Sequence, residues 1–202
     1  MNKEIQKYLN QKLDAFPDDI YGEGSRCSVY LKDGTFLPCV MLRDSKKTVE
    51  LALKRFDEEK KGKGIFKKEN TVAYENIVKH FLTSGNRVNS YDIAKVEQSR
   101  YAFPLSILRD LRGETTMSWT GFVLEMNDGK LFQFGTSFLV EFFDLPESYS
   151  FTDVSKIHNH SFVNSKGELC SLKEGFMETP EGYDIKNTYR EKPYFVCYTD
   201  GL

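Results

Sequence analysis

The sequence predicts an α+β fold in which an antiparallel sheet built from hairpins packs against three to four helices. Helical periodicity is concentrated in residues 1–112, and strand patterns with turn signals are concentrated in residues 113–202. The length of 202 residues, with 40% hydrophobic and 29% charged residues, is typical of one globular domain. We therefore expect a single domain over residues 1–202.

Four segments have apolar residues at helical spacing, each between a candidate cap and a residue or loop that ends helices. They lie between Asn2 and Pro17, between Asp44 and Lys60, between Asn70 and Gly85, and between Pro104 and Gly113. The second segment is the clearest, because Val49, Ala52 and Phe56 recur every three to four residues and so share one face. These four segments are the predicted helices.

Asp-Gly pairs between alternating apolar residues mark two hairpins, at residues 33–34 and at residues 128–129. Both central residues of the favoured two-residue turn need a positive φ, which Asp and Gly tolerate. A weaker third hairpin is expected around residues 165–167, and further strands at residues 138–143 and 194–198. Pro38 cannot donate a backbone hydrogen bond, so we expect its strand to lie at a sheet edge.

Four cysteines are spread along the chain without a C-x-x-C pair: Cys27, Cys39, Cys170 and Cys197. A secreted disulfide-stabilised chain is usually denser in cysteine. The N-terminal residues lack the apolar stretch of a secretory signal, and no apolar run reaches the length of a membrane span. These features predict a cytoplasmic protein without membrane contact, in which Cys39 and Cys197 are buried as small apolar side chains.

Charged and aromatic residues are unevenly distributed. Residues 1–100 hold 19 Lys and Arg against 15 Asp and Glu, whereas residues 101–202 hold 9 against 15. Of the 28 aromatic residues, 11 lie between Tyr101 and Phe151. The second half is therefore acidic and aromatic, a combination that favours contact with another protein.

Our first functional hypothesis is a non-catalytic cytoplasmic protein that binds another protein, in the manner of accessory or toxin-neutralising immunity proteins. The run at residues 138–143 has apolar residues on both faces of an extended strand, which indicates either a second layer or an exposed patch. Acidic neighbours, Glu141 among them, favour a basic partner. The expected binding residues are Phe138, Phe142, Phe143, Asp144, Glu147 and Tyr149.

The second hypothesis is an acid–base or metal-dependent enzyme that uses His158 and His160. In an extended segment, residues two apart point to the same face, so both imidazoles would approach one substrate or ion. Glu141 and Asp153 are the candidate carboxylates, although no spacing selects them. Because no third ligand is defined, the sequence assigns neither a metal site nor a cofactor.

The third hypothesis is nucleic-acid binding by a lysine-rich loop with one aromatic residue, which would hold phosphates and stack a base. Its residues are Lys60, Lys61, Lys63, Phe66, Lys67 and Lys68. The pI of about 6.0 argues against this function, because nucleic-acid modules are usually basic. The loop also lacks the glycine spacing of a P-loop.

Overall fold

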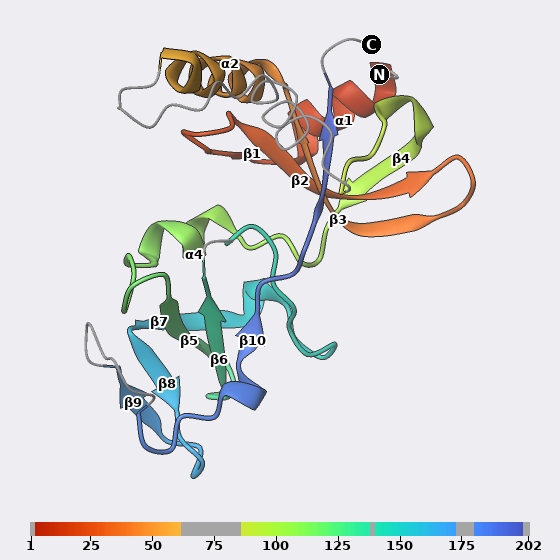
Figure 1. The fold of residues 1–202 in the computed structure, drawn as a ribbon. Helices are drawn as coiled ribbons and strands as arrows, with labels where there is room; N and C mark the ends of the chain where they lie inside the picture. The colour runs from red at the N-terminus through yellow and green to blue at the C-terminus, as the bar shows by residue number, and fades with distance from the viewer. Residues whose placement is uncertain (1–2, 62–85, 138–139, 173–179, 200–202) are drawn as a thin grey trace. The chain divides into compact units, whose positions relative to one another are not determined.

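The computed structural model describes residues 3–61, 86–137, 140–172 and 180–199, and the chain divides into two compact units (Figure 1). Unit 1 comprises residues 1–99 and 194–202, and unit 2 comprises residues 100–193. The two units therefore meet along the chain near residue 100 and again near residue 193. A single domain over residues 1–202 stays a prediction.

Unit 1 is built on a five-stranded sheet with the order β1-β2-β3-β11, in which β4 also pairs with β2. Its elements are α1 (Lys3–Lys12), β1 (Ala15–Phe16), β2 (Gly24–Leu31), β3 (Phe36–Arg43), α2 (Lys46–Lys61), η1 (Ser90–Asp92), β4 (Ile93–Gln98) and β11 (Phe195–Tyr198). The predicted hairpin joins β2 to β3, and Gly34 at its turn has φ +89°. The last strand, β11, runs parallel to β3, so the sheet is mixed.

The core of unit 1 lies where α1 packs against the sheet. Ile5 and Leu9 of α1 share a buried cluster with Cys27, Val40 and Cys197. The predicted burial of Cys39 and Cys197 is confirmed, because each exposes at most 2% of its surface.

The edge position expected for the strand of Pro38 is wrong, because β3 lies between β2 and β11. The pairing with β11 begins only at Val40, so the missing N–H of Pro38 leaves that ladder intact.

Unit 2 contains a four-stranded sheet with the order β10-β6-β5-β7 and a separate two-stranded sheet, β8-β9. Its elements are α4 (Leu105–Asp110), β5 (Thr120–Met126), β6 (Leu131–Thr136), η2 (Phe151–Asp153), β7 (Val154–Asn159), β8 (Ser161–Val163), β9 (Leu169–Ser171), η3 (Ile185–Asn187) and β10 (Tyr189–Arg190). The second Asp-Gly hairpin, β5 to β6, and the third, β8 to β9, are both confirmed. The short β10 runs parallel to β6.

One face of the four-stranded sheet carries the aromatic core of unit 2. Phe122 and Phe134 lie opposite each other on β5 and β6, and their rings stack at 5.3 Å between centroids. Ile107 of α4 joins the same cluster, so this short helix covers the apolar face. The aromatic residues of the second half therefore mostly form a core rather than a surface.

The predicted fold class is wrong in its architecture. The strands of the described ranges form three separate sheets rather than one, and two of these sheets are mixed by the parallel pairings of β11 with β3 and of β10 with β6. Three α-helices occur in the described parts of the chain, and the helix expected between Asn70 and Gly85 lies outside them. Much of the apolar surface of unit 2 is buried by its own rings rather than by helices.

Candidate functional site

The two histidines of the enzyme hypothesis are held by different partners. His158, on β7, contacts Glu125 of β5 through Nε2 and Oε2 at 2.8 Å. His160 follows the end of β7 with φ +48°, and its Nδ1 lies 2.9 Å from Thr115 Oγ1. Thr115 is buried, and its hydroxyl also accepts the backbone N–H of Gly121. The positive φ breaks the extended geometry that would have placed both imidazoles on one face.

The two acidic residues of that hypothesis, Glu141 and Asp153, lie in different surroundings. Glu141 is buried, and its backbone carbonyl accepts the N–H of Phe103. Asp153 caps η2 by accepting the N–H of Ser150 at 2.7 Å. Within the described ranges, no group of three or more His, Cys, Asp or Glu side chains is arranged to hold a metal ion. His158 and His160 thus contact Glu125 and Thr115, and joint action of the four predicted catalytic residues stays a prediction.

The predicted aromatic binding surface lies largely in the core. Phe142 and Phe143 are fully buried, while Phe138 lies outside the described residues. The ring of Tyr149 packs on Phe132, and its hydroxyl donates to Asp128 at 2.7 Å.

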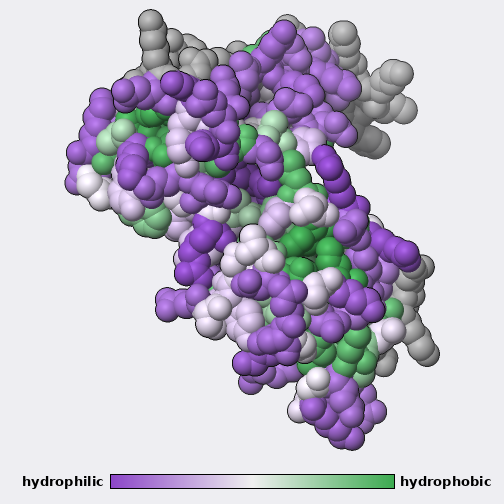
Figure 2. Space-filling view, turned by 180° about the vertical axis from the view of Figure 1, so that it is seen from behind, coloured by the Kyte–Doolittle hydropathy of each residue, from purple (hydrophilic) through white to green (hydrophobic). Residues whose placement is uncertain are grey.

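Of the three acidic residues that were expected to favour a basic partner, two are buried or paired within the fold. Glu141 is buried, and Asp144 forms an ion pair with Lys192 at 3.2 Å. Glu147 alone of the three carboxylates is exposed. Figure 2 shows polar residues over most of the visible face of the molecule, with apolar residues in small areas between them.

The lysine-rich loop falls mainly outside the described residues. Lys60 and Lys61 end α2, while Lys63, Phe66, Lys67 and Lys68 belong to the range 62–85 that the structure does not describe. The nucleic-acid hypothesis therefore stays a prediction.

Unit 2 has an open groove beside the outer strand of its sheet, which we call the edge groove. Its volume is about 660 Å³. Its walls are Ser106, Ile107 and Asp110 of α4, Phe151 and Thr152 of η2, and residues 154–157 of β7. Ile107 and Phe151 are almost fully buried, so apolar groups form its floor. Among the described residues, no strand pairs with the outer side of β7.

The register of the sheet shows which backbone groups face this groove. The N–H of Met126 donates to Lys130, so even-numbered residues of β5 direct their backbone bonds toward β6. Residues of an antiparallel pair alternate in direction, so Glu125 and Val123 bond to Lys156 and His158 of β7. Ile157, between those two, therefore directs its N–H and C=O outward. The edge groove thus combines an open strand edge with a helix wall.

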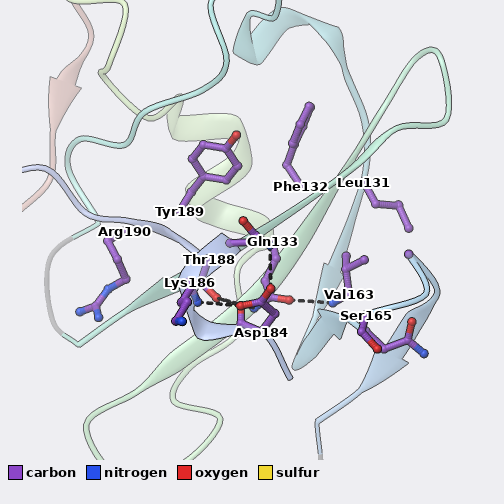
Figure 3. Close-up of a pocket in the computed structure, with 13 residues that line it drawn as sticks. Leu131, Phe132, Gln133, Val163, Ser165, Asp184, Lys186, Thr188, Tyr189 and Arg190 are labelled. Atoms are coloured by element: carbon purple, nitrogen blue, oxygen red, sulfur yellow. Dashed lines mark hydrogen bonds between the residues drawn. The ribbon is translucent and has the colours of Figure 1, made fainter. Parts of the chain in front are cut away.

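A second hollow, which we call the polar recess, lies next to β6 and β10 and has a volume of about 760 Å³ (Figure 3). Residues 131–133 of β6 form one wall, the turn between β8 and β9 a second, and residues 184–190 a third. Gln133 joins these walls: its side-chain oxygen accepts the N–H of Val163 at 2.8 Å, and its amide nitrogen donates to the Thr188 hydroxyl. Both hollows fall within the size range of ligand sites.

No family model, curated protein or solved structure matches the chain. In the part of the chain that the structure describes, no helix is long and apolar enough to cross a membrane.

Sequence reasoning missed both hollows for identifiable reasons. Strand β7 contains a bulge around Ser155, which shifts its register on β5 and breaks the period-two alternation that reveals strands. The polar recess joins residues that are about fifty positions apart, such as Gln133 and Thr188. The short-range signal available in the sequence was the Asp-Gly hairpin that creates β5 and β6.

Proposed function

We propose that the protein is a non-catalytic, cytoplasmic binding protein that holds an extended segment of another protein along the free edge of β7. The observation that carries this proposal is the open edge of β7 beside the apolar floor of the edge groove. Strand addition gains affinity from main-chain hydrogen bonds and specificity from pockets for alternate side chains. Cys27, Cys39 and Cys197 are buried as small apolar side chains, which supports the proposal of a reducing compartment.

The side chains around the edge also indicate what the segment would look like. Ile107 and Phe151 offer contacts for apolar side chains on the α4 side of the added strand. Lys156 is exposed on β7, where a lysine discourages pairing between two copies of the same edge and favours an acidic residue opposite. The preferred partner segment is therefore extended, apolar at alternate positions and acidic at one position.

Peptide selection tests this proposal. A library of random dodecapeptides is displayed against the protein, and the dissociation constants of enriched peptides are then measured on two variants. Ser106→Trp fills the groove from an exposed position, and we expect binding to weaken about tenfold or more. Arg109→Trp is the matched control on the same helix, outside the groove, and binding should stay within about twofold.

Amide exchange supplies the second readout. A bound strand would protect the outward N–H of Ile157, whereas a peptide bound elsewhere would leave its exchange rate unchanged. Selected peptides that bind Ser106→Trp as tightly as wild type, or that leave the Ile157 amide unprotected, would contradict strand addition.

A further inference from the structure

The polar groups of the recess lie on one face of the four-stranded sheet of unit 2. Leu131 and Gln133 are two positions apart on β6, so their side chains point to this face, whereas Phe132 points to the aromatic core on the other face. Gln133 is buried, and its amide nitrogen donates to the carbonyl of Asp184 at 3.4 Å and to the Thr188 hydroxyl. These hydrogen bonds hold the segment around η3 against the sheet (Figure 3).

The side-chain amides that line the recess are bonded within the fold. The oxygen of Asn164 accepts the N–H groups of Lys166 and Glu168, at 2.9 Å and 3.0 Å, which fixes the turn between β8 and β9. The side-chain amide of Asn187 donates to Asp184 at 2.6 Å. These amides therefore serve mainly to build the walls, and a site whose walls are held in this way loses little entropy on binding.

Two opposite charges line the recess without pairing with each other. The carboxylate of Asp184 accepts the backbone N–H of Lys186 at 2.9 Å, but within the described ranges no ion pair joins this carboxylate to the Lys186 ammonium. Both donors to Asp184, this N–H and the amide of Asn187, are neutral and leave its negative charge in place. Arg190 also lines the recess, and its guanidinium donates to Glu191 at 3.0 Å and 3.1 Å. The recess therefore presents one negative and one positive charge that offset each other.

We infer that the polar recess binds a small zwitterion of the α-amino-acid type, with its ammonium directed to Asp184, its carboxylate to Lys186 and an apolar side chain against Leu131 and Val163. Leu131 and Val163 are half-buried and line the same hollow. A simple anion or cation would be attracted by one of the two charges and repelled by the other, whereas a zwitterion satisfies both. Neither strand addition at β7 nor a partner protein is needed for this site.

L-Leucine and two analogues that each lack one charge test the inference by ¹H–¹⁵N NMR titration of the full-length chain. The first analogue, 4-methylpentanoate, is leucine without its amino group, and the second, 3-methylbutylamine, is leucine without its carboxylate. We expect leucine to bind about three- to fivefold more tightly than either analogue at low salt, and this preference to shrink as salt is added. Amide shifts should map leucine to residues 131–133 and 184–188.

Two variants remove one charge each, and they should give opposite patterns. Asp184→Asn keeps an oxygen that can cap η3, and it should weaken binding of leucine and 3-methylbutylamine about threefold and spare 4-methylpentanoate, which has no ammonium. Lys186→Gln should weaken binding of leucine and 4-methylpentanoate by a similar factor and spare 3-methylbutylamine. A structural loss of the site would weaken all three probes together, so the crossed pattern identifies recognition of charge.

The controls change residues outside the walls of the recess. Glu181→Gln and Lys166→Gln remove an exposed acid and an exposed lysine, and all three affinities should stay within about twofold of wild type. Ser106→Trp, in the edge groove, should also leave leucine binding unchanged, which separates this site from strand addition at β7. Absence of leucine binding, equal binding of the three probes, loss of all three in either charge variant, or an equal loss in the controls would overturn the inference.

Discussion

The indole ring of Trp119 rests on two glycines that face each other across β5 and β6. Gly121 and Gly135 are paired in register, and a Cβ at Gly135 would overlap the Trp119 ring. The guanidinium of Arg190 also lies over this ring, 4.7 Å from its centroid. This arrangement depends on backbone that only glycine leaves open, and it could not be read from the sequence because it requires the register of the two strands.

The first prediction concerns Gly135. Gly135→Ala should lower the free energy of unfolding by about 1–3 kcal/mol, because the added methyl group displaces the Trp119 ring. Urea unfolding followed by the fluorescence of Trp119, the single tryptophan, measures the change. Gly113→Ala is the control: its Cβ position has open space, and its stability should stay within about 0.5 kcal/mol. Equal stability of the two variants would contradict the packing argument.

The second prediction concerns acid titration at the second Asp-Gly turn. The Tyr149 hydroxyl and, after it, the backbone N–H of Lys130 donate to Asp128 and hold its pKa below the usual range. Tyr149→Phe should therefore raise the pKa of Asp128, as measured by NMR titration of its carboxyl carbon. Tyr91→Phe, at an exposed tyrosine, should leave this pKa unchanged.

The sign of the stability effect follows from the lowered pKa. A carboxylate whose pKa falls on folding stabilises the protein above its unfolded-state pKa, and this contribution is lost as the pH drops through the folded-state pKa. Wild type and Tyr149→Phe should therefore differ near neutral pH and converge in strong acid. A difference that persists unchanged in strong acid would assign the effect to ring packing on Phe132 instead.

At the scale of elements, local sequence signals predicted the hairpins correctly, whereas pairings between distant segments were not predicted. All three hairpins were found from their turns, because a turn and its two strands are adjacent in the sequence. The parallel pairing of β11 with β3 joins segments more than 150 residues apart, and no local pattern encodes it. The sequence analysis did not predict the mixed sheets for that reason, and the predicted fold class was therefore wrong.

The apolar run at residues 138–143 was predicted to be covered by a second layer or to form an exposed patch, and the structure distinguishes these alternatives for two of its residues. Apolar residues on both faces were interpreted as a second layer or an exposed patch. In the structure, Phe142 and Phe143 form isolated bridges with Ala102 and Glu191 and are fully buried. The second layer is therefore the correct alternative for these two residues, since the connecting segments on both sides cover them.

The candidate site illustrates the same limit. The spacing of His158 and His160 is a local observation, but the φ of +48° that separates them belongs to the turn between two different sheets. The edge groove depends on which strand ends the sheet, and that order is set by tertiary contacts. Residue type alone therefore indicated candidates without placing them.

At the scale of the whole molecule, the two units differ in how the chain builds them. Unit 2 is one continuous segment with its own aromatic cluster, whereas unit 1 needs residues from both ends of the chain. Strand β11 supplies Cys197 to the buried cluster of unit 1 and pairs with residues 40–43 of β3. The two clusters share no residue.

The last prediction follows from this connectivity. A chain that ends at Pro193 lacks β11, so unit 1 should unfold while unit 2 keeps its structure. In ¹H–¹⁵N NMR spectra, the Trp119 indole signal and the amides of β5 and β6 should remain dispersed, whereas the amides of β2 and β3 should collapse to random-coil positions.

Two full-length variants separate loss of the strand from shortening of the chain. Cys197→Asp places a charge in the buried cluster and should unfold unit 1 in the same way, because an unpaired buried charge is strongly destabilising. Phe195→Ser changes an exposed side chain of the same strand and should leave both units folded. Simultaneous loss of both units on truncation would instead show the single cooperative domain that the sequence predicts, because one cooperative domain unfolds as a whole.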